Sequence, residues 1–208
     1  MSLKTWLTAA CTLMLAASVQ AEALKLVFTG DIMLDDGPGR LIGKGGDPLL
    51  LFSAILQDAD YRIGNLECAI AESGNQIDNK IYNFRAKPRV MRILKGRIDA
   101  VSLANNHAGD FGHEAFRETM HHLGQAGIQY FGGGRNLSEA HKPLWIERKG
   151  LKIAVLGYNE FKPRSFEAGA EWPGVAWSED DHVIADIRGA KAAGADLVIP
   201  FMHWGWER

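Results

Sequence analysis

Short apolar runs that alternate with helical patterns constrain this chain more than any other feature. Turn-forming residues such as Gly, Asn and Asp follow these runs. Such alternation is typical of repeated βα units, and it predicts an α/β protein. The predicted strands are Leu24–Phe28, Tyr61–Gly64, Ala100–Leu103, Ile128–Phe131, Leu144–Glu147, Lys152–Leu156 and Leu197–Met202.

Helical patterns fill the intervals between the predicted strands. Pro48 and Pro88 each open a helix, because proline is favoured at the first helical position. Ser178 and Asp181 resemble a capping box before the last helix. The step over 147–151 resembles a hairpin turn, which predicts mixed sheets. The predicted helices are Leu49–Gln57, Arg89–Lys95, Gly112–Gln125 and Val183–Ala193.

The first 21 residues have the pattern of a secretory signal. Lys4 precedes an apolar run that starts at Trp6, and small residues precede a cleavage point after Ala21. The run is shorter than the roughly 20 residues that span a bilayer. We therefore expect residues 22–208 to form one exported domain, periplasmic or extracellular, without a transmembrane anchor. Cys11 lies in the run without a convincing lipoprotein motif, so after cleavage Cys68 is the one remaining cysteine and no disulfide framework is expected.

Charge and apolar content narrow the function classes. The formal net charge is −2, so no overall basic field indicates nucleic acid as a partner. Hydrophobic residues make up 47% of the chain, which is enough for a core. The last apolar run reads as a central strand, yet the sequence stops soon afterwards at Arg208. We therefore expect the chain to be truncated at its C-terminus.

Polar side chains gather at the ends of four predicted strands. Because the ends of parallel strands open onto one crevice, we expect these clusters to converge. Carboxylates, amides and imidazoles together suit Mn, Fe or Zn better than a thiolate-rich structural site would. Each cluster alone could equally be turn chemistry, and a lone histidine could belong to the core. Their recurrence favours a metal or polar active site. The clusters are Gly30-Asp31, Gly64-Asn65-Leu66-Glu67, Asn105-Asn106-His107 and the segment from His203 to Glu207.

Five motifs occur in a fixed order over nearly all of the mature chain: LVFTGDIML, GNLE, SLANNHAGDFG, GIQYFGGG and MHWGWE. As a set they resemble the capsule-synthesis CapA family, which is similar in fold to the calcineurin-like metallophosphoesterases. The resemblance implies a four-layer α/β/β/α sandwich with mixed sheets, incomplete at its C-terminus in this chain.

The resemblance also implies roles for individual residues. The implied catalytic residue is His107, which would protonate or orient a leaving oxygen. A bound metal pair would clamp the electrophile and lower the pKa of a bound water. The implied metal ligands are Asp31, Glu67, Asn106 and His203, and the residues expected near substrate are Asn65, Asn105, Arg85 and Glu207.

The sequence also departs from the metallophosphoesterase pattern. Met33 stands where an Asp-x-His motif has its histidine, and it is a poor ligand for a hard ion. Glu67 stands where aspartate is usual, and Ala108 follows His107 where an acid is common. A later Gly-x-His-x-His motif has no counterpart before Arg208. One of the two metal sites therefore lacks expected ligands.

Six basic residues lie between Phe84 and Arg97 with no acidic residue among them. A run of like charge is usually a solvated face. The alternative is a surface that binds an acidic polymer, with Arg85 as the best candidate to contact it because Arg85 follows a loop. The six are Arg85, Lys87, Arg89, Arg92, Lys95 and Arg97.

Together these features favour an exported accessory protein for the synthesis or attachment of an acidic capsule or envelope polymer of the poly-γ-glutamate type. Its partners would be the polymer or its precursor and other capsule-synthesis proteins. Two alternatives remain open. One is a metal-dependent phosphoesterase with His107 as the acid, and the other is a metal-free polymer-binding subunit that uses Arg85 and Arg89.

Overall fold

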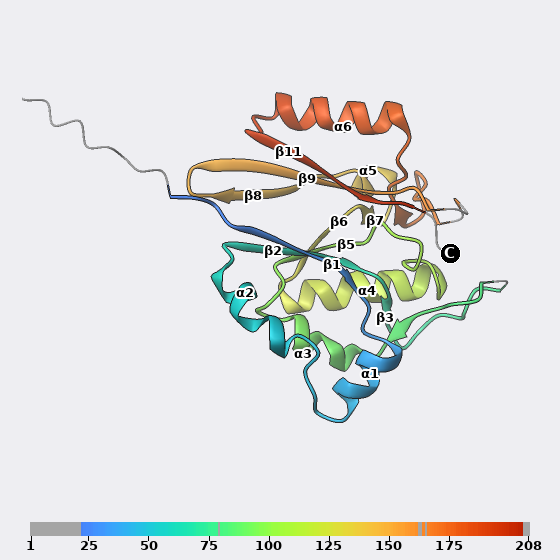
Figure 1. The fold of residues 1–208 in the computed structure, drawn as a ribbon. Coiled ribbons are helices and arrows are strands. Elements are labelled where there is room, and N and C mark those ends of the chain that lie inside the picture. Colours follow the sequence, from blue (N-terminus) through green and yellow to red (C-terminus); the bar gives the residue numbers. More distant parts are fainter. Residues whose placement is uncertain (1–21, 79, 162–163, 165, 206–208) are drawn as a thin grey trace, which may run out of the picture.

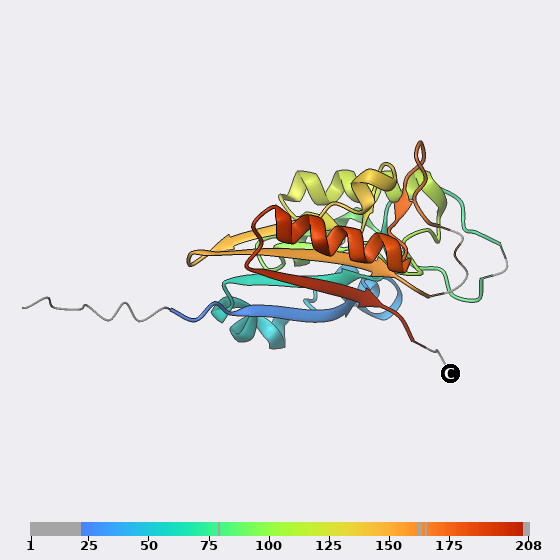
Figure 2. The same cartoon turned by 90° about the horizontal axis from the view of Figure 1, so that it is seen from above.

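Two β-sheets are stacked face to face in this computed structural model, which describes residues 22–78, 80–161, 164 and 166–205 (Figures 1 and 2). The first sheet has the order β1-β2-β5-β6 and is parallel throughout. Its strands are β1 (Leu26–Ile32), β2 (Tyr61–Leu66), β5 (Ala100–Ser102) and β6 (Gln129–Phe131).

The second sheet has the order β11-β9-β8. β11 runs parallel to β9, whereas β8 and β9 form an antiparallel hairpin, so the predicted mixed sheet is confirmed. Lys149 and Gly150 both have positive φ in the hairpin turn, which matches the twist of the flanking strands. The strands are β8 (Leu144–Arg148), β9 (Leu151–Asn159) and β11 (Leu197–His203).

Helices cover the outer face of each sheet and complete the four layers (Figure 1). Those outside the first sheet are α2 (Ser53–Asp58), α3 (Met91–Leu94) and α4 (Gly112–Ala126), and α6 (Asp180–Ala192) covers the second sheet. The α/β sandwich expected from the sequence is therefore the fold observed. Smaller elements are α1 (Asp36–Gly43), η1 (Leu50–Phe52), β3 (Ala69–Ile70), β4 (Arg85–Ala86), η2 (Pro88–Val90), β7 (Gly133–Gly134), α5 (Leu137–Ala140) and β10 (Gly174–Val175).

The core between the sheets follows from the two-residue repeat of a strand. Tyr61 and Ile63 of β2 point the same way and pack with Ile146 of β8 and Ile153 of β9. Each such side chain contributes roughly 1.5–3 kcal/mol when fully buried. Gly157 of β9 lies close to the backbone that follows β6, because an added Cβ there would lie 3.0 Å from the Cα of Gly132.

The outer faces form separate cores. Leu66 and Val101 belong to a cluster with Phe116 of α4 on the helical side of the first sheet. On the second sheet, Ala154 packs against Ala190 of α6. Alternate residues of each strand thus pack in different cores, one between the sheets and one under the helices. Because a shift of one residue would exchange these two sets, the packing fixes the register of both sheets.

Several helices and strands extend beyond one of their predicted ends. β1 continues to Ile32 and β2 to Leu66, because parallel pairing between them extends past the apolar runs. The capping box at Ser178 is not formed. The last helix begins earlier than predicted, with Glu179 at its N-cap and no side-chain cap, while the Ser178 hydroxyl donates to Glu160.

The N-terminal segment expected to be a signal, residues 1–21, lies outside the described residues. In the described part of the chain, no helix combines the length and apolar content needed to cross a bilayer.

α4 is joined to the segment after β3 by hydrogen bonds to a partly buried carboxylate. Glu118 accepts the amides of Glu72 and Ser73 at 3.0 and 2.9 Å, and also the Ser73 hydroxyl. Burial raises the pKa of Glu118, but these hydrogen bonds and one from His122 outweigh it and lower the pKa to about 2. The ionised carboxylate therefore stabilises the folded chain.

Replacing Glu118 tests the contribution of these hydrogen bonds to stability. Because hydrogen bonds to a charged group are strong, Glu118→Gln is expected to lower the free energy of unfolding by about 1–2 kcal/mol at neutral pH. Because folding lowers the pKa of Glu118, its carboxylate contributes fully to the free energy of unfolding at pH values above its unfolded pKa. This contribution is lost as the pH falls towards 2. Urea unfolding at neutral and acidic pH measures the difference, with exposed Glu114→Gln as the control. A difference that does not shrink on acidification would contradict the assignment.

Candidate metal centre at the strand ends

The carboxyl ends of strands from both sheets meet at one end of the sandwich. Asp31 lies near the end of β1, Glu67 directly follows β2, and His203 is the last residue of β11. Asn106 and His107 come from the loop between β5 and α4. The predicted convergence of four clusters is therefore observed for the residues that the structure describes.

A register shift within β1 determines the position of the Asp31 side chain. The pairing register between β1 and β2 shifts between Phe28 and Asp31, and Gly30 lies in the shift with φ of +70°. Such a backbone conformation favours glycine. Beyond the shift Asp31 lies opposite Asn65 of β2. The Gly30-Asp31 pair thus forms part of the strand and re-aims the carboxylate, and it is not a turn after the strand.

Three side chains form a potential metal-binding group. Asp31, Glu67 and His203 each offer a ligand atom, and these atoms lie within 4.8 Å of one another. His203 Nε2 is 3.5 Å from Glu67 Oε1, and His203 Nδ1 is 4.0 Å from Asp31 Oδ1. Asp31 is largely exposed, whereas Glu67 and His203 are mostly buried. The group therefore opens to solvent on one side.

Two asparagines border this group. Asn106 Oδ1 lies 2.8 Å from His203 Nε2, so its amide oxygen faces the same space as the three ligands. The Asn65 amide donates to Asp31 Oδ1 at 2.8 Å and to Glu67 Oε2, and it lies 3.2 Å from His203 Nδ1. Asn65 therefore holds the two carboxylates together and orients them.

Asn105 fixes the loop that carries these residues. Its amide donates to Asn65 Oδ1 and to the Leu66 carbonyl, both at 2.9 Å, and its Oδ1 accepts the His107 amide at 3.0 Å. The side chain is buried, and both of its amide hydrogens are used inside the protein. The structure therefore gives Asn105 a positioning task, and its contact with substrate stays a prediction.

His107 is oriented by an aspartate that sequence reasoning missed. His107 Nδ1 lies 2.7 Å from Asp110 Oδ2, and Asp110 is fully buried. A carboxylate accepts only, so Nδ1 carries the proton. His107 Nε2 then faces Glu67 Oε1 at 3.9 Å. The expected acid follows His107 by three positions, not one, and the aspartate in ANNHAGD was the available signal.

Lys80 compensates the charge of Asp110. Its ammonium group contacts Asp110 Oδ1 at 2.5 Å, the Asn106 carbonyl at 2.6 Å and His107 Nδ1 at 3.2 Å. The Phe84 amide donates to the other Asp110 oxygen at 2.7 Å. This network ties the segment before β4 to the loop that carries His107.

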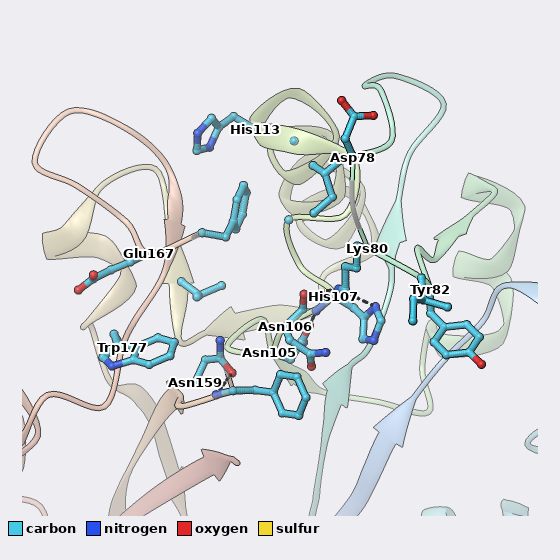
Figure 3. A pocket seen from close by; sticks show the side chains of 17 residues that line it. Asp78, Lys80, Tyr82, Asn105, Asn106, His107, His113, Asn159, Glu167 and Trp177 are labelled. Carbon is cyan, nitrogen blue, oxygen red and sulfur yellow. Dashed lines mark hydrogen bonds between the residues drawn. The ribbon is translucent and has the colours of Figure 1, made fainter. Parts of the chain in front are cut away.

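A cavity of about 800 Å³ lies beside the His107 network. Figure 3 shows Lys80, Asn105, Asn106 and His107 on one side of it and Asn159 with Trp177 on another. Its walls are mainly apolar, and their large side chains are Ile77, Ile81, Tyr82, Phe161, Phe166 and Trp177.

Arg85, which the sequence predicts near substrate, lies away from the metal-binding group. The guanidinium group of Arg85 donates to the carbonyls of Ser73 and Gly74 at 3.1 and 3.0 Å and lies 4.2 Å from the centre of the Phe111 ring. The structure does not bring Arg85 to the carboxylate group. Glu207 lies outside the described residues.

The donor set fits a divalent ion bound through oxygen and nitrogen. Two carboxylates and an imidazole, with the Asn106 amide oxygen beside them, are ligands typical of Mn, Fe or Zn sites. Cys68 follows Glu67 in sequence but is not part of the group. Burial raises the pKa of its thiol to about 12, and its sulfur accepts the Leu34 amide. Cys68 is thus a neutral core residue.

The strand-end motifs also agree with a known family. The family model described as bacterial capsule synthesis protein PGA_cap matches residues 25–208. The chain belongs to this capsule synthesis family. The resemblance inferred from the five motifs is thereby confirmed, and each described member of the metal-binding group lies within the matched region.

Individual members of the capsule synthesis family are also similar to this chain. It is 30% identical over 195 residues to the PGA biosynthesis protein CapA of Bacillus subtilis, covering 89% of this chain and 50% of that protein. It is 27% identical over 199 residues to the capsule biosynthesis protein CapA of Bacillus anthracis, covering 89% and 47%. A probable polyglutamine synthesis accessory protein of Mycobacterium tuberculosis is 32% identical over 166 residues, covering 73% and 43%. The chain thus spans about half the length of these relatives.

Metal binding by the strand-end group is directly testable. Titration calorimetry with Mn²⁺ or Zn²⁺ is expected to show binding that weakens by about tenfold or more in Glu67→Gln and in His203→Asn, since each variant removes one ligand. Exposed Glu72→Gln serves as a charge-matched control and should bind as the parent chain does. Equal affinity in all four proteins would show that the ion binds elsewhere.

The role of Asp110 predicts a spectroscopic change. Nitrogen NMR of the parent chain should show His107 protonated at Nδ1, whereas Asp110→Asn removes the carboxylate acceptor and should give a mixture of tautomers. The variant is also expected to lose about 1–3 kcal/mol of stability, because the ammonium of partly buried Lys80 loses its ion pair. An unchanged His107 tautomer would show that Lys80 or the loop backbone sets the ring.

Proposed function

We propose that this protein is an exported accessory factor for the synthesis or attachment of an acidic capsule or envelope polymer of the poly-γ-glutamate type, with a divalent metal centre as its working site. The observation that carries this proposal is the Asp31, Glu67 and His203 group at the strand ends of a capsule synthesis family chain. The names of its relatives, which refer to PGA and polyglutamine synthesis, support the choice of polymer.

An ion held by Asp31, Glu67 and His203 would offer the preferred binding site for an anionic group of the substrate. Lys80 is the one lysine or arginine among the described residues that line the cavity, and it already contacts Asp110. Asp78 and Glu167 also line the cavity and would repel a run of carboxylates. The cavity therefore suits one end or one linkage of a polymer, with its apolar walls excluding water.

Bound Mn, Fe or Zn would supply Lewis-acid chemistry at this centre. The residues of the chain then have separate tasks. Asp31, Glu67 and His203 would hold the ion, Asn65 orients the carboxylates, and Asp110 holds His107 with Nε2 towards Glu67. When protonated at Nε2, His107 can donate a proton to a leaving oxygen bound in the adjoining space.

One observation favours a second candidate function, a metal-dependent phosphoesterase. The His107–Asp110 pair beside a carboxylate-rich group has the parts that phosphate-ester hydrolysis needs, namely an oriented acid and ligands for an ion. Turnover of a phosphate monoester that requires added Mn²⁺ and falls about a hundredfold in His107→Ala would favour this activity.

The proposed function is tested in a producing cell. The chromosomal gene is replaced by Glu67→Gln, His203→Asn or the control Glu72→Gln, and surface polymer is measured per cell. We expect about tenfold less polymer with the first two variants, because loss of a ligand weakens the centre. Immunoblots of the envelope fraction check both export and protein level.

The same experiment separates the metal-free alternative. If the polymer yield is unchanged in Glu67→Gln and His203→Asn but falls in Arg89→Ala, the protein acts as a polymer-binding subunit and the metal proposal is wrong. Normal yield in every variant, with the protein at its usual level, would reject the capsule function itself.

A further inference from the structure

The segment formed by η1 and α2 exposes an unusual amount of apolar surface. Leu50, Leu51, Phe52 and Ile55 are 63%, 92%, 54% and 58% exposed. Leu51 and Ile55 are four residues apart and so lie on the same side of the helical segment. Leu56 is buried on the opposite side, in the main core. We call these four exposed residues the apolar ridge.

Basic residues lie in the segments next to the apolar ridge. Residues 36–58 contain two basic and three acidic residues, whereas residues 84–97 contain six basic residues and no acidic one. Asp36 is paired with Arg40, and Asp58 is paired with Lys25. Asp47 is already paired with Arg97 at 2.5 Å. Lys44 and Lys95 are exposed, and no described carboxylate pairs with either. The segments next to the ridge therefore carry unpaired positive charge at Lys44 and Lys95, in a chain whose formal net charge is −2.

Direct contacts join the basic stretch to the loop that precedes the ridge. Arg92 donates to the carbonyls of Ile42 and Gly46 at 2.8 and 3.2 Å, and Arg97 binds Asp47 in the same loop. Figure 1 shows α1, α2 and α3 together on the side of the molecule away from α6. The apolar ridge and the basic stretch thus belong to one face.

We propose that this face docks on a membrane surface that contains anionic lipids. An apolar ridge with a basic border is the arrangement by which peripheral proteins insert side chains at the headgroup boundary while their cations bind lipid phosphates. The Lys44 and Lys95 ammonium groups would meet the phosphates, and Leu51 and Phe52 would enter the boundary between headgroups and acyl chains.

Charge favours lipid over a second copy of the chain. In a two-fold symmetric dimer the same face meets itself, so the basic borders of both copies would be brought together. Like charges at close range oppose such an interface. An acidic polymer could satisfy the cations but offers no apolar partner for Leu51.

Docking in this way would fix the orientation of the strand-end site. The strands run alongside the layer of α2 and α3, and their carboxyl ends lie at one end of that layer (Figure 1). The crevice would then open along the bilayer surface rather than into it. The lipid proposal rests on the exposed ridge and its charges, and it does not depend on the metal centre or on the proposed function.

Vesicle flotation of the full chain tests the proposal. Binding is measured on phosphatidylcholine vesicles with and without phosphatidylglycerol, and it should increase with anionic lipid and weaken with salt. The double variant Leu51→Ser with Phe52→Ser should bind anionic vesicles about tenfold less. Ile184→Ser, which changes an exposed residue of α6, should bind as the parent does. The N-terminal apolar segment is common to all variants, so their differences report this face.

A charge-matched pair separates the electrostatic contribution. Lys44→Glu with Lys95→Glu should abolish the preference for phosphatidylglycerol, whereas Lys142→Glu with Arg188→Glu, an equal change of net charge at exposed positions elsewhere, should retain it. Circular dichroism melts verify that each variant is folded.

Three results would overturn the proposal. The first is equal binding to neutral and anionic vesicles, and the second is unchanged binding by the Leu51 and Phe52 variant. The third is a dimer, seen by light scattering, that this variant dissolves while vesicle binding stays the same. That last result would assign the face to a second copy of the chain.

Discussion

The stacking of the two sheets is the constraint on which the rest of the structure depends. Asp31 and Glu67 belong to the first sheet and its following loop, whereas His203 belongs to the second sheet. These ligands approach one another only because the inter-sheet core, with Ile63 and Ile153 at its centre, holds the sheets at a fixed offset. A shift of one residue in either sheet would exchange its inward and outward side chains and separate the ligands.

The strand-end polar groups form a connected network, and this connection makes their burial tolerable. Glu67, Asn65, Asn105 and Asp110 are all buried, and an unsatisfied polar group in such a place costs roughly 1–3 kcal/mol. Each accepts or donates hydrogen bonds within the cluster or to the backbone. Hydrogen bonds from the chain itself therefore orient the ligand side chains, as the supporting residues of a metal site do.

Sequence reasoning identified the residues whose position depends on strand pairing and missed those that depend on loop packing. Asp31 and Glu67 could be predicted to converge because parallel strands of one sheet end at the same edge. His203 meets them because the second sheet, which contains β11, stacks on the first. Lys80 could not be predicted, because it reaches the site from an irregular segment with no periodicity. Arg85 was expected near substrate because it follows a loop. In the structure its guanidinium group donates hydrogen bonds to the carbonyls of Ser73 and Gly74.

The basic stretch between Phe84 and Arg97 shows a related limit. A count of charges cannot distinguish a solvated face from residues that bind neighbouring loops, and the structure contains both kinds. Arg92 and Arg97 fasten the loop that carries Asp47, whereas Lys95 remains exposed. The sequence pattern located the charge, and only tertiary contacts decide how much of it reaches solvent.

A net charge close to neutral conceals two opposite local fields in this molecule. The strand ends gather carboxylates that favour a cation, while the face around the apolar ridge gathers ammonium and guanidinium groups that favour an anion. Interactions between exposed charges are screened beyond about 8–10 Å at physiological salt, so each region acts on its own surroundings. The net charge of the chain therefore argues against a nucleic-acid partner only for the average field of the molecule. It leaves open what a local face attracts, and the apolar residues beside the cations favour a surface with both phosphate and hydrocarbon over a purely polar polyanion.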